Sequence, residues 1–239
     1  MSISKNELRQ VHALSQKKFR DQTRLFVVEG EKMVSEALES GFEVISVYRR
    51  DEIGSEAMER LSMLSSPSPV LAVVRQPAPV PFKPEKGLYL ALDGIRDPGN
   101  LGTILRVADW FGIDGVVASP DTVELYNPKV VQSTMGAIFR VPYYTMDIPT
   151  LCRAVIAEGG HVYGTFLDGE NMYSKALDCG SQTPSVIVIG NESNGISPET
   201  AACVSDRLFI PPYPADDPGS ESLNAAIATA ITVAEFRRR

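Results

Sequence analysis

The chain contains 239 residues, of which 44% are hydrophobic and 22% are charged. This composition is typical of a folded, soluble protein, and the length favours two domains over one. No segment approaches the roughly 20 consecutive apolar residues of a membrane span, and the N-terminus lacks the apolar core of a signal peptide, so we expect a cytoplasmic protein. The three cysteines are widely spaced and accompanied by only two histidines, which disfavours a disulfide framework and a bound metal.

The net charge of −7 opposes binding to nucleic acid, because phosphate contacts depend on Lys and Arg. The charge is unevenly distributed, however. Residues 1–24 carry six basic side chains against only Glu7 and Asp21. A local basic strip is enough to dock a polyanion, so the overall charge does not exclude such a partner.

The first 76 residues alternate short apolar runs with amphipathic segments. This alternation predicts a small α/β module. We expect helices over 4–19, 32–39 and 55–64, and strands around 26–28, 44–47 and 70–74.

A proline-rich stretch follows the first module. Proline cannot donate a backbone hydrogen bond and favours extended chain, so residues 77–86 are interpreted as a linker. It separates a first domain, residues 1–76, from a second domain, residues 87–239.

The second domain opens with GLYLALDG, a fully apolar run typical of a strand buried on both faces of a parallel sheet. Further apolar runs alternate with helical segments and predict an α/β fold with a mostly parallel sheet. These runs lie at residues 116–118, 162–165, 186–189 and 208–210.

The last helix has the clearest periodicity in the sequence. Its apolar residues recur at i, i+3, i+4 and i+7, which predicts one buried stripe. The stripe comprises Leu223, Ala226, Ile227, Ala230, Ile231 and Ala234. Ser220 or Ser222 is a suitable N-cap for this helix, and its many alanines leave room for another backbone to pass closely.

Three segments place turn residues and short polar side chains at the ends of predicted strands. In the first, 92–112, a Gly/Pro/Asp turn opens a helix, whose N-terminus gathers partial positive charge. The predicted buried stripe of this helix comprises Leu101, Ile104, Leu105 and Ala108. Arg106 lies off the stripe, which is also the pattern of an ordinary solvated arginine.

The second segment, 186–197, is an apolar strand that ends in Gly190, Asn191 and Glu192. Loops at the carboxyl ends of parallel strands are where ligands bind in α/β sheets, although a plain Gly/Asn turn has the same composition. The spacing from Gly190 to Gly195 imitates a phosphate-binding loop, but the required lysine is missing and no GxGxxG follows a strand. Nucleotide hydrolysis and nicotinamide binding therefore lose their main support. The third segment, 208–231, joins a strand to the last helix through a proline-rich loop.

In this order the three segments resemble the three motifs of the SpoU family of SPOUT methyltransferases. The matching residues are Asn100 and Arg106 in the first motif, Gly190-Asn191-Glu192 and Gly195 in the second, and Ile210-Pro211 and Ser222-Leu223-Asn224 in the third. Ala225-Ala226 departs from the Val-Ser that relatives more often carry, which puts in question only a hydroxyl contact. The first domain, through QKKFRDQTRLFVVEGEKMVSEAL and SPVLAVVRQP, is similar to the RNA substrate-binding module found ahead of many such catalytic domains, itself similar to a small ribosomal RNA-binding fold.

The resemblance implies an RNA 2′-O-ribose methyltransferase that uses S-adenosylmethionine and has a C-terminal trefoil knot. It implies that the methyl donor binds at Thr165, Leu167, Gly190, Asn191, Glu192, Ile210, Pro211, Leu223 and Asn224. It assigns the reaction to Arg106, with Asn100, Glu192, Ser222 and Asn224 completing a polar pocket. Because a guanidinium has a pKa above about 12, we expect Arg106 to stabilise the developing oxyanion as a cation.

The resemblance also bears on partners. We expect ribosomal RNA as the substrate, bound through Lys17, Lys18, Arg20 and Arg24, and a homodimer with apolar contacts from the last helix and residues 95–112. Two alternatives stay open: the same chemistry on transfer RNA or on an antibiotic-resistance site of the ribosome, and a non-catalytic RNA-binding or assembly factor with the same fold.

Overall fold

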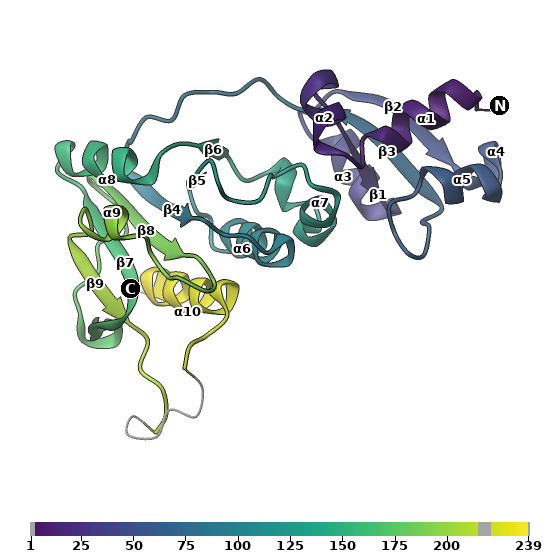
Figure 1. Cartoon of the computed structure of the whole chain (residues 1–239). Coiled ribbons are helices and arrows are strands. Elements are labelled where there is room, and N and C mark those ends of the chain that lie inside the picture. Colours follow the sequence, from purple (N-terminus) through teal and green to yellow (C-terminus); the bar gives the residue numbers. More distant parts are fainter. Residues whose placement is uncertain (1–2, 215–220, 239) are drawn as a thin grey trace. The chain divides into compact units, whose positions relative to one another are not determined.

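The computed structural model describes residues 3–214 and 221–238. The chain forms two compact units (Figure 1). Unit 1 comprises Met1–Pro79 and Glu124–Arg140, and unit 2 comprises Val80–Val123 and Val141–Arg239. No helix in the described ranges is long and apolar enough to cross a membrane.

Unit 1 is built on a three-stranded antiparallel sheet with the order β1-β3-β2. Its strands are β1 (Leu25–Glu29), β2 (Val44–Arg49) and β3 (Val70–Arg75). The helices before and between them are α1 (Lys5–Ala13), α2 (Lys17–Thr23), α3 (Glu31–Glu39), α4 (Arg50–Ile53) and α5 (Ser55–Leu61). β3 is apolar from Val70 to Val74 because it is the central strand, and these residues are buried.

Two helix predictions in unit 1 need correction. The single helix expected over 4–19 is two helices, because the chain turns after α1 and Gln16 adopts an extended conformation ahead of α2. The helix expected over 55–64 ends at Leu61. There the Ser62 hydroxyl donates a hydrogen bond of 2.6 Å to the buried carboxylate of Glu29, which draws the chain toward the sheet.

A segment from the second half of the sequence completes unit 1. It contains α7 (Pro128–Thr134) and the 3-10 turn η1 (Ala137–Phe139). Two ring contacts and two ion pairs hold it: Phe26–Tyr126, Phe42–Phe139, Arg20–Glu124 and Glu36–Arg140. Burial in this contact raises the pKa of Tyr126 to about 12.

Unit 2 is built on a six-stranded parallel sheet with the order β6-β5-β4-β8-β7-β9. Its strands are β4 (Gly87–Asp93), β5 (Gly115–Ala118), β6 (Tyr143–Thr145), β7 (His161–Asn171), β8 (Pro184–Gly190) and β9 (Asp206–Phe209). The other elements are α6 (Pro98–Trp110), α8 (Ile148–Ala157), the 3-10 turn η2 (Met172–Ser174), α9 (Pro198–Ala201) and α10 (Ala225–Arg238). The predicted α/β fold with a mostly parallel sheet is confirmed.

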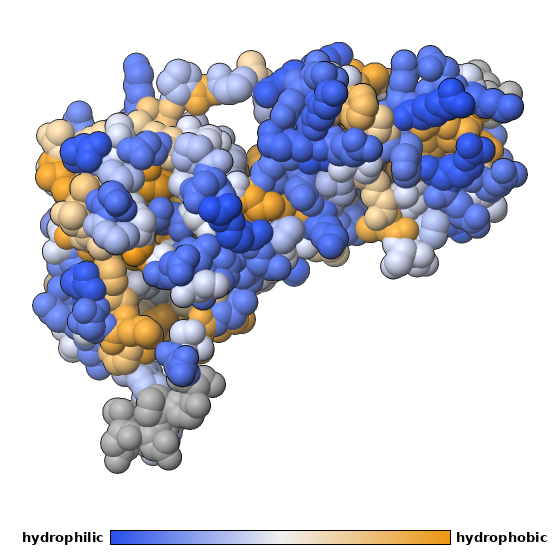
Figure 2. Space-filling view, viewed as in Figure 1, coloured by the Kyte–Doolittle hydropathy of each residue, from blue (hydrophilic) through white to orange (hydrophobic). Residues whose placement is uncertain are grey.

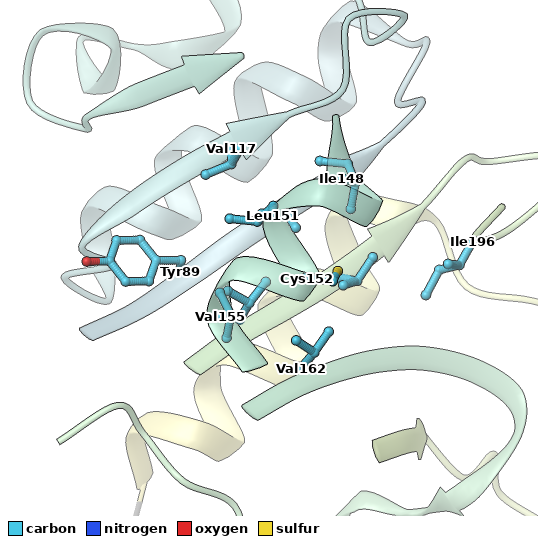
Figure 3. Packing of buried hydrophobic residues seen from close by; sticks show 11 residues of the cluster. Tyr89, Val117, Ile148, Leu151, Cys152, Val155, Val162 and Ile196 are labelled. Atoms are coloured by element: carbon cyan, nitrogen blue, oxygen red, sulfur yellow. The ribbon is translucent and has the colours of Figure 1, made fainter. Parts of the chain in front are cut away.

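Helices cover both faces of this sheet. Alternate strand residues such as Val117, Val162 and Val186 pack under α8, whose Leu151 and Val155 point into the same core (Figure 3). The opposite face carries α6 and α10. The last helix reaches the sheet through Phe236, whose ring lies 5.0 Å from that of Tyr163 on β7. A sheet buried on both faces explains why its strands are continuously apolar.

Helices α6 and α10 lie side by side and run in the same direction. At their N-terminal ends Asn224 donates a hydrogen bond of 2.9 Å to Asn100. At their C-terminal ends Arg237 donates hydrogen bonds to the carbonyls of Phe111 and Gly112. The chain thus returns from the edge strand β9 to α6. The expected threading of a knot involves the β9–α10 connection, which runs partly outside the described residues.

The predicted buried stripe of the last helix is wrong at Leu223 and Ile227, although Ala226 is buried. Leu223 and Ile227 are about half exposed, at 49% and 51%, whereas Thr229, Val233 and Phe236 are fully buried. The helix is apolar or small on nearly every side, so periodicity alone does not select the face that packs. The N-cap is also different: the side-chain oxygen of Asn224 accepts from the amide of Ala226 at 2.9 Å. Ser222 precedes the cap, and Ser220 lies outside the described residues.

Candidate active site

The polar residues of the three motifs meet at the carboxyl edge of the parallel sheet. β4 and β8 are neighbours, with Asp93 opposite Gly190, so the loops that follow them lie together. The Asn191 side-chain amide donates a hydrogen bond of 2.6 Å to the carbonyl of Gly94, which ties one loop to the other. Ligands of open α/β sheets bind at this edge.

The loop after β4 opens α6. Asp97 is the N-cap, and its side chain accepts from the amide of Asn100 at 2.8 Å. Pro98 occupies the first turn, where a missing amide hydrogen costs nothing. Asn100 is buried, so its side-chain amide needs partners of its own.

Glu192 supplies one of these partners. Its carboxylate accepts from the side chain of Asn100 at 2.8 Å and from the backbone amides of Arg96 and Asp97 at 3.2 and 3.1 Å. Burial opposes the charged carboxylate, but these hydrogen bonds outweigh it and lower the pKa of Glu192. Glu192 is therefore an ionised acceptor at neutral pH, placed where a helix N-terminus favours negative charge.

Asn224 completes the cluster from the third motif. Its side-chain nitrogen donates to the side-chain oxygen of Asn100, while its oxygen caps α10. One hydrogen-bonded chain thus joins Glu192, Asn100 and Asn224, which come from three distant parts of the sequence. We call these three residues the Asn100 cluster.

Glycine is required at position 190 by the protein's own backbone. A Cβ atom there would lie 2.2 Å from the carbonyl carbon of Gly195 and from the amide nitrogen of Ile196. The loop closes on itself, and the side chain of Asn191 accepts from the amides of Ser193 and Asn194. The second motif is thus a tight turn that presents Glu192.

Arg106 does not join the Asn100 cluster. As predicted, α6 buries Leu101, Ile104, Leu105 and Ala108, and Arg106 is exposed on another side of the helix. Arg106 lies six positions after Asn100, about 9 Å along the helix axis. Its guanidinium makes no hydrogen bond or ion pair with any residue that the structure describes, so it is available to a ligand.

Among the residues expected to hold the methyl donor, Thr165 and Leu167 lie within β7, and the others lie at the end of β8, on the loops after β8 and β9, and just before α10. Thr165 bonds weakly to the carbonyl of Val188, at 3.4 Å. Ile210 and Pro211 are half-buried, and Leu167 is 70% exposed. Ser222 is exposed and makes no hydrogen bond within residues 3–214 and 221–238.

Sequence reasoning missed the framework around Arg96. The Arg96 guanidinium donates a hydrogen bond of 2.8 Å to Asp121 in the loop after β5. Ser119 donates to the other oxygen of Asp121 at 2.6 Å and accepts from the amide of Gly94 at 2.9 Å. The only signal in the sequence was a Ser and an Asp just after a predicted strand.

The predicted RNA-binding role of Arg20 is contradicted by its burial. Its side chain is 2% exposed, it is paired with Glu124, and it donates to the carbonyls of Leu14 and Ser15. Four of its five N–H groups are thus bonded inside unit 1, and the guanidinium is not accessible to a phosphate. Arginine at this position holds the 124–140 segment in unit 1.

The other three predicted RNA-binding residues are exposed. Lys17 forms an ion pair of 2.6 Å with Asp21, and Arg24 donates to the carbonyl of Pro77. Lys18 has no partner among the described residues. Hydrophilic side chains cover most of the visible face of α1 and α2 (Figure 2).

Comparison with known proteins identifies the family. Residues 87–234 match the model of the SpoU rRNA Methylase family, and residues 5–76 match that of the MRM3-like substrate binding domain. The chain belongs to the SpoU rRNA methylase family. The family predicted from the three motifs is thus confirmed.

Individual members of the SpoU family resemble the chain over its length. The 23S rRNA (guanosine(2553)-2′-O)-methyltransferase RlmP of Bacillus subtilis is 31% identical, with 94% of this chain and 93% of RlmP covered. A structure of the TrmH family from Porphyromonas gingivalis is 37% identical, with a TM-score of 0.89 over 100% of this chain and 99% of that one. An AdoMet-bound rRNA methyltransferase from Sinorhizobium meliloti is 30% identical, with a TM-score of 0.87 over 100% and 96% of the chains.

Proposed function

We propose that this protein transfers a methyl group from S-adenosylmethionine to a ribose 2′-hydroxyl of ribosomal RNA. The observation that carries the proposal is the Asn100 cluster. Glu192 and Asn224 follow Asn100 by 92 and 124 positions in the sequence, yet both form hydrogen bonds with its side chain. The names of relatives support it, since RlmP is a 2′-O-methyltransferase of 23S rRNA and the Sinorhizobium meliloti structure binds AdoMet.

The proposed donor site fits the chemistry of the donor. S-adenosylmethionine combines a flat, largely apolar purine with a charged methionine portion that carries an electrophilic methyl group on sulfur. Leu167 in β7 and Leu223 just before α10 are apolar side chains left 70% and 49% exposed, and a purine would cover such surface. Gly190, Asn191, Ile210 and Pro211 would hold the donor mainly through their backbone, with Thr165, Glu192 and Asn224 contributing polar groups.

The residues of this chain would act by positioning and by charge. The Asn100 cluster fixes the loops after β4 and β8 and the start of α10, and so keeps the pocket organised before substrate binds. Arg106 is a permanent cation, so its role is to stabilise the negative charge that develops on the ribose oxygen. Ser222 is free to contact the ligand from the start of α10.

The proposed RNA-binding surface of unit 1 consists of Lys17, Lys18 and Arg24. Following the match to a substrate-binding family, the proposed domain boundaries are 1–76 for substrate binding and 87–239 for catalysis. The proposed linker is 77–86, and the proposed place of action is the cytoplasm.

A homodimer is the proposed functional state. Trp110 on α6 is 85% exposed and Ile227 on the neighbouring α10 is 51% exposed. Apolar surface of this kind marks a binding face, and a second copy of the chain would cover it. Sedimentation at micromolar concentration should give twice the chain mass, whereas a monomer would contradict the dimer.

The decisive experiment is a map of 2′-O-methylated riboses. Total RNA from cells with and without the gene should differ at one or a few ribosomal positions, and purified protein with radiolabelled donor should restore them. If methylation is lost only in transfer RNA, the substrate is transfer RNA and the reaction is the same. Donor binding without any lost methylation would favour an assembly factor that keeps the fold.

A further inference from the structure

Arg96 lies against the reaction site but plays no part in the Asn100 cluster through its side chain. Its backbone amide donates to Glu192, which fixes its position at the carboxyl edge of the sheet. Its guanidinium extends instead to Asp121 in the loop after β5, and the side chain is 64% exposed. The positively charged guanidinium of Arg96 is thus exposed to solvent beside the Asn100 cluster.

The charge of the surrounding loops makes this position unusual. Within the described part of unit 2, the loops after β4, β5, β8 and β9 cover residues 94–97, 119–123, 191–197, 210–214 and 221–224, and Arg96 is the one Lys or Arg in them. The same residues include the acids Asp97, Asp121, Glu192 and Glu221. RNA is a polyanion and must approach this acidic edge to present a ribose, so a cation here offsets part of the repulsion.

The guanidinium is also fixed in place. Asp121 is itself held by the Ser119 hydroxyl, which in turn accepts from the amide of Gly94. Exposed ion pairs contribute little to stability, so folding does not account for this arrangement. Only one donor of Arg96 is used by Asp121, and the remaining N–H groups match the oxygens of a phosphate in pairs.

We propose that Arg96 binds a phosphate of the RNA next to the ribose that is methylated, and that Asp121 positions it. The proposal rests on the function proposed above, because it takes the acceptor to be RNA. Its guanidinium orients the strand, while Arg106 acts at the ribose oxygen. Arg96 is therefore a substrate-binding residue whose loss affects RNA and not the methyl donor.

The test compares the full-length protein with Arg96→Ala, Arg96→Lys and the control Arg153→Ala. Arg153 is an exposed arginine on α8, bonded only to Thr150 within the described chain, so the control removes the same charge elsewhere on unit 2. Binding to a 23S ribosomal RNA transcript is measured at several KCl concentrations, and donor binding by calorimetry. Thermal unfolding of each variant checks that the fold is retained.

Arg96→Ala should weaken RNA binding about tenfold or more at low salt, as for a lost charge-assisted hydrogen bond. The slope of log affinity against log salt should flatten by about 0.7 to 0.9, the value of one phosphate contact. Arg96→Lys should keep the slope but lose part of the affinity, because a point charge cannot form the paired contact. Donor affinity should not change in either variant.

Equal RNA affinity and equal salt slope in Arg96→Ala and Arg153→Ala would overturn the proposal. So would a fall in donor affinity that matches the fall in RNA affinity, since that would indicate a structural role. Failure of the proposed function is a separate result: wild-type protein would then bind the transcript without methylating it, whatever the behaviour of Arg96.

Discussion

The side-chain amide of Asn100 uses both its nitrogen and its oxygen in hydrogen bonds. It therefore needs an acceptor on one side and a donor on the other. Its nitrogen donates to Glu192 and its oxygen accepts from Asn224. The carboxylate of Glu192 accepts hydrogen bonds from the amides of Arg96 and Asp97 and from the side chain of Asn100. A glutamine there would have one acceptor oxygen, and its NH₂ group would face at least one of these donors. The chemistry of the site is therefore set by protonation state as much as by position.

Glu192→Gln should loosen the start of α6. The amide group would face the backbone N–H groups of Arg96 and Asp97 with one acceptor instead of two. Hydrogen exchange at these two amides should accelerate and turnover should fall. Glu199→Gln, an exposed acid on α9, is the matched control. Unchanged exchange in both variants would contradict the importance of the carboxylate.

The lowered pKa of Glu192 gives the fold a pH dependence of known sign. A carboxyl whose pKa is lower in the folded state stabilises the fold above its unfolded pKa of about 4.3. That contribution is lost as the pH falls through the depressed folded value. Urea unfolding of the wild type should thus weaken more steeply than that of Glu192→Gln as the pH drops below about 5. Parallel curves would show that the carboxylate gains nothing from its hydrogen bonds.

Arg106→Ala tests the proposed stabilisation of the oxyanion. Turnover should fall by at least about 100-fold, the scale of losing one preorganised stabiliser. Donor affinity should stay the same, because Arg106 forms no hydrogen bond or ion pair with the described residues assigned to the donor. Single-turnover methylation and calorimetry measure the two effects, and an equally active variant would remove Arg106 from the mechanism.

At the scale of elements, the apolar pattern predicted the strands and the buried face of α6 well, but not the buried face of α10. Every strand of the parallel sheet except the short β6 was expected, because burial on both faces leaves no polar interruption. The face of α10 was mistaken because the buried residues near its start are the small Ala225, Ala226 and Thr229, while the larger Ile227 is half exposed. Close approach selects small side chains, and a hydrophobic pattern does not record that.

The packing of α10 predicts an uneven response to aromatic truncation. Phe236→Ala should lower the free energy of unfolding by about 3 to 5 kcal/mol, because the ring is fully buried against Tyr163. Tyr213→Ala should change it by less than about 0.5 kcal/mol, since that ring is 99% exposed. Chemical unfolding compares the two, and similar losses would mean that α10 is not anchored by its C-terminal turn.

At the scale of the whole molecule, the motifs predicted the residues that meet at the candidate site but not the framework around Arg96. Asn100, Glu192 and Asn224 were each predicted, and their convergence follows from parallel strands that end at one edge. Arg20 was misassigned because a count of charges says nothing about burial. Its partner Glu124 lies 104 residues away, and no local pattern connects the two.

Charge removal on unit 1 should separate binding from folding. The Lys17→Ala, Lys18→Ala and Arg24→Ala triple variant should weaken RNA binding and flatten its salt slope by up to about 2 to 3. Arg20→Ala should instead cost about 3 kcal/mol or more of stability, because it leaves Glu124 without its cation. Filter binding across a salt series and thermal unfolding measure each, and a flattened slope in Arg20→Ala alone would reverse the assignment.

Because residues 124–140 belong to unit 1, a fragment that contains only the N-terminal part of the chain lacks a part of that unit. A piece ending at Pro79 would keep Phe26 and Phe42 but lose Tyr126 and Phe139, the rings that cover them. It would also leave the buried guanidinium of Arg20 without its carboxylate partner, Glu124. We expect this fragment to aggregate or to stay partly unfolded. The complementary fragment would expose the rings of Tyr126 and Phe139 to solvent. We therefore expect that dividing the chain within residues 77–86 does not yield two fragments that each fold.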